Sequence, residues 1–356
     1  MKNWLIPLLI LSLGLMGLLT LSSVSPELMQ RQLLFFAFGL VLFWFASQLP
    51  TQQWWRWGKW LWKGLVIILL GLLIFGRATR GAVAWIDLGW GLRFQPSQFA
   101  LLAFVSFALP KFTKTQVLKD AQIVKLLWLF TTPLLLILLQ PDFGTGFLYV
   151  VSALPLLLWQ KIPKQYWRGF WLATLLLLIV GWTMILKPYQ KLRLTSFIAG
   201  SQADQTGVGY NARQALIAVG SGQLTGRGLG HGTQSQLRFL PERQTDFIFA
   251  SLAEEWGLLG ALVLIGLYAV LIIFLLYQAK FVSELDQALF LLIAAVHFLI
   301  QILVNIGMNI GLLPITGITL PLISYGGSSL LATLLLLGIA QRIITQAKGK
   351  SHLHIS

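Results

Sequence analysis

The sequence predicts an all-α integral membrane protein with about ten transmembrane helices and one large extracytoplasmic loop. Three observations lead to this fold class: 57% of the 356 residues are hydrophobic, only 10% are charged, and the mean hydropathy is +0.78. A water-soluble domain of this length needs far fewer apolar residues. Lipid is therefore the solvent for most of the chain, which we treat as a single polytopic domain over residues 1–356.

Apolar runs that approach the roughly 20 residues needed to cross a bilayer core alternate with polar connections. The first run follows a single lysine, Lys2, and lacks a small-residue cleavage site, so we interpret it as a retained anchor and not as a signal peptide. The predicted spans are 4–23, 31–49, 58–76, 96–112, 122–140, 143–160, 167–187, 247–278, 286–307 and 322–345.

Basic residues fall in alternate connections and thereby predict the topology. With a cytoplasmic N-terminus the positive-inside rule is satisfied, and the C-terminus is then cytoplasmic as well. We expect a multi-pass protein of the cytoplasmic (inner) membrane with both termini inside. The basic residues of the cytoplasmic connections are Arg56, Lys59, Lys63, Lys111, Lys114, Lys119, Lys161, Lys164, Arg168, Lys280, Arg342, Lys348 and Lys350.

The remaining composition excludes several function classes. The net charge of +15 does not indicate nucleic-acid binding, because the basic residues are dispersed between apolar segments and form no stripe or tail. The chain has no cysteine, which excludes disulfides, thiol catalysis and cysteine-ligated metals. Its four histidines show no metal-like spacing, so the histidines alone identify no metal site.

The extracytoplasmic loop 188–246 connects the seventh and eighth predicted helices. Its six basic and three acidic residues leave a net charge of +3, which indicates either contact with lipid head groups or an anionic partner outside the bilayer. The stretch GSGQLTGRGLGHG at 220–232 lacks the lysine-containing ending of a P-loop. A tightly folded loop and an anion cradle both remain open for it.

Asp246 ends this loop immediately before the predicted helix 247–278. A short acidic side chain there suits a helix N-cap, and a carboxylate at the mouth of a membrane cavity beside Arg243 suits a general base. The two roles are compatible. Glu254 lies eight residues further, about 12 Å along a helix, which is too far for a carboxylate dyad. We therefore expect a structural or coupling role for Glu254.

Three further polar features lie in or beside predicted spans. His297, Gln301, Asn305 and Asn309 recur every four residues and predict one polar stripe, for which interhelical hydrogen bonding is favoured over a ligand path. Asp142 precedes the span 143–160, where a cap and a site role are both open. The sequence SYGGSS at 324–329 opens the last span and suits close packing or a helix N-terminus that faces an anion.

Several long segments, taken together, resemble the SEDS family (shape, elongation, division and sporulation) of integral membrane peptidoglycan polymerases. The stretch GTQSQLRFLPE is more similar to the RodA-like elongation branch than to the division branch. The matching segments are FQPSQFA at 94–100, LQPDFGTG at 139–146, the segment from GYNARQAL to SLAEEWG at 209–257, and NIGMNIGLLPITGITLPLISYGGSSLL at 305–331.

The resemblance implies a glycosyltransferase that polymerises lipid II at the outer face of the cytoplasmic membrane during cell elongation. It makes Asp246 the catalytic residue, undecaprenyl diphosphate the leaving group, and a class B penicillin-binding protein the transpeptidase partner. The leaving diphosphate needs positive charge, for which the loop arginines and a divalent cation, Mg²⁺ or Mn²⁺, both stay open, and no organic cofactor is expected. The residues we expect at the substrate are Arg193, Arg213, Arg243, Asp142, Gln234, Ser324 and Ser328.

The chain departs from the family on its fourth span. The family motif QPSEFAK carries an acid and a lysine where this sequence has Gln98 and Leu101, and Ala84 replaces an arginine that often precedes the tryptophan at 85. Losing both charges together removes a neutral pair at smaller cost than losing one. Two other functions stay open. The polar stripe at 297–309 and the many spans suggest a lipid-linked sugar flippase, whereas Gln98 and Leu101 suggest a catalytically weakened scaffold for a penicillin-binding protein.

Overall fold

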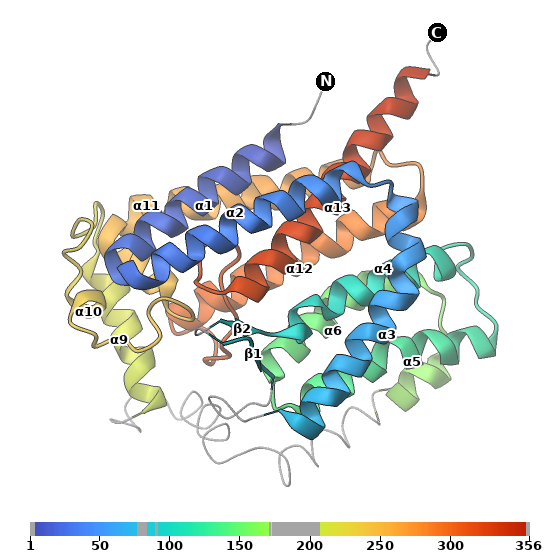
Figure 1. The fold of residues 1–356 in the computed structure, drawn as a ribbon, viewed down its shortest axis with the longest axis horizontal. Helices are drawn as coiled ribbons and strands as arrows, with labels where there is room; N and C mark the ends of the chain where they lie inside the picture. The colour runs from blue at the N-terminus through green and yellow to red at the C-terminus, as the bar shows by residue number, and fades with distance from the viewer. Residues whose placement is uncertain (1–3, 77–83, 90–91, 171, 173–206, 354–356) are drawn as a thin grey trace. The chain divides into compact units, whose positions relative to one another are not determined.

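The computed structural model describes residues 4–76, 84–89, 92–170, 172 and 207–353, and within them the chain is mostly helical (Figure 1). The one sheet among the described residues is an antiparallel hairpin of two short strands, in which Ile86 pairs with Phe94 and Asp87 with Arg93. The elements are α1 (Leu5–Val24), α2 (Pro26–Gln48), α3 (Thr51–Phe75), β1 (Ile86–Asp87), β2 (Arg93–Phe94), the 3₁₀ turn η1 (Pro96–Phe99), α4 (Ala100–Phe112), α5 (Asp120–Leu139), α6 (Phe143–Trp159), α9 (Val208–Ser221), α10 (Thr233–Gln236), α11 (Ile248–Ala279), α12 (Leu285–Asn309) and α13 (Gly327–Leu353).

The helices agree with an all-α membrane protein. In the described residues, seven helices are long and apolar enough to cross a bilayer, and α6 is a shorter apolar helix. Large apolar side chains also remain exposed on the helix surfaces, for example Phe75 at 84% and Ile74 at 72%, as expected where lipid replaces water. Each predicted span has a helix, except that most of 167–187 lies outside the described residues.

The chain divides into two compact units, which we describe separately. Unit 1 comprises Met1–Trp44, Pro188–Phe274 and Phe298–Leu337. Unit 2 comprises Phe45–Lys187, Leu275–His297 and Gly338–Ser356.

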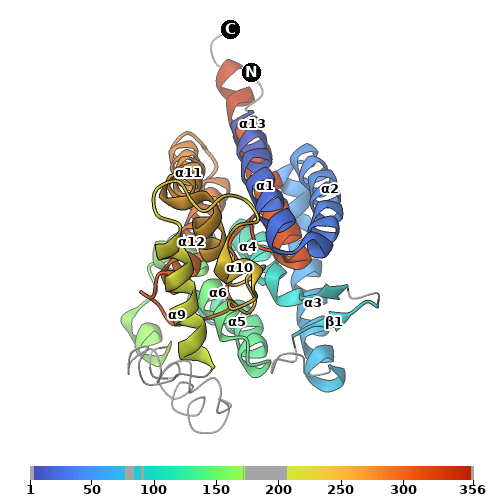
Figure 2. The same ribbon diagram turned by 90° about the vertical axis from the view of Figure 1, so that its left-hand side faces the viewer.

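In unit 1, small residues let α1, α2 and α13 lie side by side (Figure 1, Figure 2). A Cβ added at Gly14 would lie 2.3 Å from the Phe36 ring, and one at Gly39 would lie 2.3 Å from Leu334. A Cβ at Gly17 would meet the backbone of Ile323 at 2.9 Å. These glycines permit the close approach of backbones that stabilises helix pairs in lipid, where no hydrophobic effect drives helices together.

In unit 2, α3 packs against α4 and α5, and α6 packs against α4 and α5 (Figure 1). Gly58 allows the first contact, because a Cβ there would lie 2.2 Å from the Ser106 carbonyl oxygen. The Trp62 indole donates to the Leu129 carbonyl at 3.0 Å and joins α3 to α5. The stacked rings of Phe130 and Tyr149, 5.3 Å apart, join α5 to α6.

The sequence predicts a continuous 32-residue helix after Asp246, and this prediction is wrong in one respect. α11 has this length, but Gly257 interrupts it with φ 68° and ψ −168°. The glycine-rich segment 220–232 docks at this break: a Cβ on Gly257 would lie 2.2 Å from the Gly226 amide nitrogen, and one on Gly226 would lie 2.2 Å from the Glu255 carbonyl oxygen. Only glycine tolerates both the backbone conformation and this contact.

Hydrogen bonds complete this contact, which we call the glycine clasp (residues 222–228 against 254–259). The amides of Arg227 and Gly228 donate to the carbonyls of Glu254 and Glu255 at 2.9 and 3.0 Å. In return, the amides of Leu258 and Leu259 donate to the Gln223 and Leu224 carbonyls at 2.8 and 3.1 Å. The backbone groups that the helix break frees are thus satisfied. This favours the tightly folded loop over the anion cradle.

The loop 188–246, which the sequence predicts to be extracytoplasmic, is also not a plain loop. Residues 188–206 lie outside the described residues, but the remainder contains the 14-residue helix α9 and the single turn α10. The face of α9 that carries Ala215 and Ala218 is fully buried in one apolar cluster with Phe247 and Ala250. This tertiary contact gives a helix to a segment whose composition alone indicates a loop.

Candidate active site

Asp246 lies near the end of a tight turn, residues 241–247, that leads into α11. The amides of Thr245 and Phe247 both donate to the Glu242 carbonyl, at 3.1 and 3.3 Å, and the Thr245 hydroxyl donates to Glu242 Oε2 at 3.2 Å. Glu242 itself has a positive φ of 52°. The turn therefore fixes the backbone on both sides of Asp246, and α11 begins two residues later at Ile248.

Two asparagines of α12 hold the backbone of Asp246. The Nδ2 atoms of Asn305 and Asn309 donate to the Asp246 carbonyl at 3.2 and 3.0 Å. Asn305 also donates to the Ile318 carbonyl at 2.7 Å, and Asn309 Oδ1 accepts the Ala250 amide at 3.1 Å. Both asparagines are fully buried. The polar stripe thus forms hydrogen bonds between segments, as predicted, and these bonds position Asp246.

The segment before α13 holds the two preceding residues of the turn. The Tyr325 amide donates to the Gln244 carbonyl at 2.9 Å, and the Ser324 hydroxyl donates to the Thr245 carbonyl at 2.7 Å. Three successive carbonyls, ending at Asp246, are therefore anchored from outside the turn. Ser324, which the sequence places at the substrate, is engaged with this frame. Ser328 is buried in the first turn of α13.

Gln32 of α2 belongs to the same frame and was missed in the sequence. Its Nε2 atom donates to the Ser324 carbonyl at 3.1 Å, and its Oε1 atom accepts the Gly326 amide at 3.3 Å. The side chain is 2% exposed. The available signal was a lone amide at the start of an apolar run, where a polar residue needs a partner.

The Asp246 side chain is half-buried and lies near Gly317. A Cβ added at Gly317 would lie 3.6 Å from Asp246 Oδ2, and the φ of Gly317 is +78°. Directly after Asp246 the chain enters an apolar cluster through Phe247, which is 2% exposed. The carboxylate therefore lies beside Gly317, which has no side chain, and the residue that follows Asp246 belongs to an apolar core.

The predicted arginines have different surroundings. Arg243 Nε and Nη2 donate to the Val24 carbonyl at 3.2 and 3.1 Å, which ties the turn of Asp246 to the end of α1. Burial, and then the charge of Arg238, lower the pKa of the Arg243 guanidinium. Arg213 is half-buried on α9, the helix that packs beside the start of α11. Arg193 lies outside the described residues, and its role stays a prediction.

Glu254 has the structural role that its distance from Asp246 predicts. It is fully buried and accepts the amides of Gln234 and Ser235 at 2.8 and 3.0 Å and the Ser235 hydroxyl at 2.6 Å. These bonds hold the single turn α10 against α11. The Gln234 side chain keeps its Oε1 atom buried without a hydrogen-bond partner in the described part of the chain.

Asp142 forms a separate polar cluster in unit 2. It caps α6 by accepting the Thr145 amide at 3.2 Å, and it accepts Gln95 Nε2 at 2.7 Å and the Ser97 hydroxyl at 3.3 Å. Gln98 donates to Gln95 Oε1 at 3.2 Å. Burial raises the pKa of the Asp142 carboxyl above the usual aspartate value, and these hydrogen bonds oppose the rise.

Leu101, at the other departure from the family motif, is 3% exposed in α4. The glutamine and leucine at these positions are therefore accommodated, one by hydrogen bonding and one by apolar burial. Asp142 fulfils the capping role that the sequence left open beside a site role.

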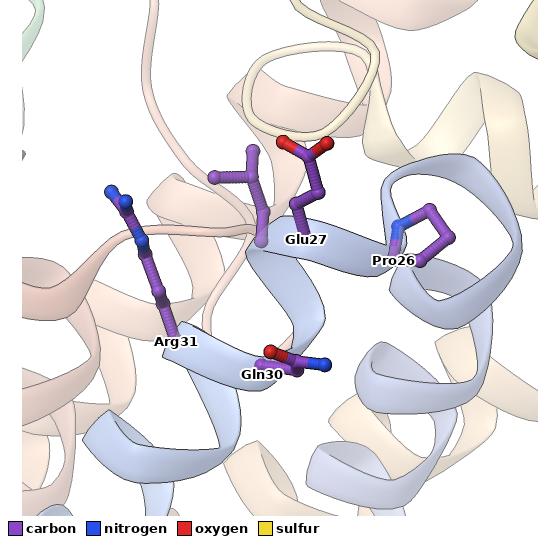
Figure 3. A pocket seen from close by; sticks show the side chains of 5 residues that line it. Pro26, Glu27, Gln30 and Arg31 are labelled. Atoms are coloured by element: carbon purple, nitrogen blue, oxygen red, sulfur yellow. The ribbon is translucent and has the colours of Figure 1, made fainter.

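An open pocket of about 520 Å³ lies at the beginning of α2 (Figure 3). Pro26, Glu27, Leu28, Gln30 and Arg31 line it. Figure 3 shows the Glu27 carboxylate and the Arg31 guanidinium extending from the same side of the helix. Gln32, the next residue, reaches Ser324 in the frame of Asp246. The pocket therefore adjoins an element that supports the candidate catalytic residue.

No metal-binding cluster is found within the described residues, since no three histidine, aspartate or glutamate side chains come together there as ligands. The described protein side chains therefore do not form a divalent-cation site of three or more such ligands.

This arrangement suits proton abstraction at a fixed point. General-base catalysis requires a carboxylate whose backbone does not move when it takes up a proton. The turn, the two asparagines and the segment before α13 supply that restraint for Asp246 in unit 1. Among the described residues, Arg213 and Arg243 are the arginines that the sequence predicts at the substrate, where they would offset anionic charge.

The fold and this site define a polytopic membrane protein of one known family. The sequence profile of the family described as "Cell cycle protein" (FtsW, RodA and SpoVE) matches residues 3–349. The chain belongs to this family. It is similar to peptidoglycan glycosyltransferase MrdB of Escherichia coli K12, with 37% identity over 96% of this chain and 93% of the relative.

Division-branch relatives and solved structures agree. Probable peptidoglycan glycosyltransferase FtsW of Thiomicrospira cyclica is 36% identical over 95% of this chain and 90% of its own length. The rod shape determining protein RodA of Thermus thermophilus superposes with a TM-score of 0.72 at 27% identity, covering 97% of both chains. A chain of a peptidoglycan synthase complex gives a TM-score of 0.80 at 28% identity, covering 97% of this chain and 98% of that chain.

Proposed function

We propose that this protein is a peptidoglycan glycosyltransferase of the RodA-like branch, which polymerises lipid II into glycan strands at the outer face of the cytoplasmic membrane. Asp246, held by the two asparagines of α12, is the observation that carries the proposal. The names of the relatives support the activity. The identity of the substrate rests on the resemblance of the motifs.

In the proposed reaction, the Asp246 carboxylate accepts the proton of the 4-hydroxyl of the GlcNAc of lipid II. The hydroxyl oxygen forms a new bond to the anomeric carbon of the growing strand, and the bond from that carbon to the undecaprenyl diphosphate oxygen breaks. Attack opposite the leaving group inverts the anomeric centre to a β1,4 link. The electron pair of the broken bond leaves with the diphosphate.

The leaving diphosphate gains negative charge, which positive groups stabilise. Arg213 and Arg243 are the described arginines of unit 1 that we assign to this task, and Arg193 remains a further candidate. We propose that Mg²⁺ or Mn²⁺, where required, arrives bound to the diphosphate of the substrate. Removal of divalent cations with a chelator, followed by addition of each metal, tests this in the polymerisation assay.

We also propose a class B penicillin-binding protein as the partner transpeptidase. A solved structure that matches 97% of this chain comes from a complex described as coordinating polymerization and crosslinking. A glycan polymer needs crosslinking to become a wall, so the partner enzyme acts on the product of this one. Co-purification of the two full-length proteins from membranes tests the association.

The decisive experiment is the substitution Asp246→Asn, assayed with purified full-length protein, its penicillin-binding protein partner and fluorescent lipid II. Removing a general base lowers the rate by about 10²-fold or more. Asp87→Asn is the matched control, because Asp87 is an exposed aspartate of the β1–β2 hairpin and belongs to unit 2. It should leave the rate within about twofold.

Both variants should unfold at the wild-type temperature. A folded Asp246→Asn protein that polymerises lipid II at the wild-type rate would exclude Asp246 as the base. Wild-type protein that moves lipid II across liposome membranes without making polymer would favour the flippase. Wild-type protein that binds its partner but yields no glycan would favour the scaffold.

A further inference from the structure

A positively charged surface lies in unit 2, where α3 begins, α4 ends and α5 begins. The three helices meet at Trp62, in the middle of α3, whose ring centroid lies 6.2 Å from that of Phe107 in α4 and 4.8 Å from that of Trp128 in α5. The Trp62 indole also donates to the Leu129 carbonyl. The aromatic contacts fix which side chains of the three helices become neighbours.

Lysines lie beside aromatic rings of the same three helices. The ammonium of Lys111 lies 4.1 Å from the centroid of the Phe107 ring. The ammonium groups of Lys59 and Lys63 lie 5.7 and 5.4 Å from the ring of Trp60. Lys125 precedes Trp128 by three positions and therefore shares its face of α5. Lys59 and Lys125 are both close enough to Lys111 for their charges to repel it.

These like charges lack neutralising partners. None of the lysines at 59, 63, 111 and 125 pairs with a carboxylate among the residues that the structure describes, and all four are exposed. Two acids of the same unit are engaged elsewhere: Asp286 accepts the Trp55 indole at 2.8 Å, and Asp120 bonds to the hydroxyl of Tyr166. Three helices thus bring together positive charges that an anionic ligand would relieve.

The same surface is amphipathic. Trp60 is 67% exposed and Trp128 is 54% exposed, so large apolar rings stand beside the ammonium groups. Tryptophans gather at the boundary between head groups and acyl chains, and basic pockets between membrane helices bind anionic head groups. A free anion would need the lysines only. A phospholipid explains both the lysines and the exposed rings.

We propose that Lys59, Lys111 and Lys125 bind the phosphodiester of an anionic phospholipid, whose acyl chains lie against Trp60 and Trp128. The site is on the side that the positive-inside rule places in the cytoplasm, away from the extracytoplasmic glycosyl transfer. It is a lipid-binding function separate from polymerisation. Its test uses no lipid II, so the result does not depend on the proposed enzyme activity.

The experiment measures binding of phosphatidylglycerol to delipidated full-length protein in neutral detergent by native mass spectrometry. The triple variant Lys59→Gln, Lys111→Gln and Lys125→Gln should lose about tenfold or more in affinity, because each lysine beside an anionic lipid contributes a factor of roughly five. The control triple variant Lys114→Gln, Lys161→Gln and Lys164→Gln removes the same charge from exposed lysines with no aromatic neighbour described. It should bind within about twofold of wild type.

Further arms separate the sources of the effect. Phosphatidylcholine should bind at least about tenfold more weakly than phosphatidylglycerol, and millimolar inorganic phosphate should not displace the lipid. Equal losses in both triple variants, equal binding of the two lipids, or displacement by phosphate would each overturn the proposal. Should the triple variant fail to fold, Lys111→Gln alone should weaken phosphatidylglycerol binding severalfold, and an unchanged affinity would overturn the proposal in the same way.

Discussion

The side-chain amide of Asn309 makes three hydrogen bonds with backbone groups, one of them to the Asp246 carbonyl. Its Nδ2 atom donates to the carbonyls of Asp246 and Asn305 at 3.0 and 2.8 Å, and its Oδ1 atom accepts the Ala250 amide at 3.1 Å. The residue is fully buried. Because these partners satisfy the buried amide, it adds no desolvation penalty for an unpaired polar group. Removing the side chain would leave its hydrogen-bonding partners unpaired in the protein interior.

The substitution Asn309→Ala should therefore lower both stability and turnover. Leaving the Ala250 amide unpaired and weakening the hold on the Asp246 carbonyl costs about 1–3 kcal/mol in the free energy of unfolding. Because Asn309 acts through the position of Asp246, kcat for lipid II should fall at least about tenfold while KM changes little. Thermal unfolding and steady-state polymerisation measure the two effects.

Asn211→Ala provides the comparison. Asn211 is a half-buried asparagine of α9 whose backbone amide bonds to Gly207. Its truncation should leave kcat within about twofold of wild type. If Asn309→Ala raised KM and left kcat unchanged, Asn309 would contact substrate and would not be a positioning residue for Asp246.

At the scale of elements, the glycine clasp connects the segment 222–228 to α11, the helix that follows Asp246. The substitution Gly257→Ala puts a Cβ 2.2 Å from the Gly226 nitrogen, on a residue with φ of 68°. Strain of this kind costs about 1–3 kcal/mol, before the loss of the hydrogen bonds across the clasp. We expect a lower unfolding temperature and a reduced polymerisation rate.

Gly266→Ala is the matched control in the same helix, since a Cβ at Gly266 meets nothing within 4 Å. Alanine in a helix interior is favoured over glycine by roughly 0.5–1 kcal/mol, so this variant should be as stable as wild type or slightly more stable. Equal unfolding temperatures for the two variants would show that the clasp does not stabilise α11.

How far the sequence predicts these elements depends on the type of contact that makes each of them. Lipid requires backbone hydrogen bonds to be satisfied within a helix, so apolar length alone locates helices such as α1, α5 and α12. The break at Gly257 is not visible in this way, because a segment well upstream in the sequence stabilises it. α9 was missed for the same reason, since its buried face depends on Phe247 and Ala250.

The candidate site shows the same limit. Asp246 was identifiable because its motif context resembles a family and because an acid at the end of a membrane loop is unusual. The stripe of Asn305 and Asn309 was visible as a spacing of four. Periodicity predicts neither the hydrogen bond of Gln32 to Ser324 nor that of Asn305 to the Asp246 carbonyl, because each bond joins segments that are remote in sequence.

At the scale of the whole molecule, the contacts within unit 2 support the alternating topology. The start of α3 meets the start of α12 where Trp55 donates to Asp286, and it meets the end of α13 where Thr51 donates to Gln346 at 3.1 Å. The connection after α6 meets the connection after α4 where the Lys161 amide donates to the Gln116 carbonyl at 2.9 Å. Within each of these two groups, segments predicted to be cytoplasmic therefore contact one another.

The absence of cysteine from the sequence makes this topology directly testable. Single cysteines introduced at Leu88 and Leu224, both 64% exposed, should react with a membrane-impermeant maleimide on intact spheroplasts. Cysteines at Gln116 and Ser283, which are exposed on the connections after α4 and α11, should react only after the membrane is permeabilised.

The physical reason is the distribution of charge. Lys111, Lys114, Lys119 and Lys280 flank the second pair of sites, and basic residues beside short connections are retained on the cytoplasmic side. Labelling in the reverse pattern would place Asp246 in the cytoplasm, where a glycan strand for the wall cannot be built. The orientation measured at these four positions therefore decides whether Asp246 lies on the side of the membrane where it can reach its proposed substrate.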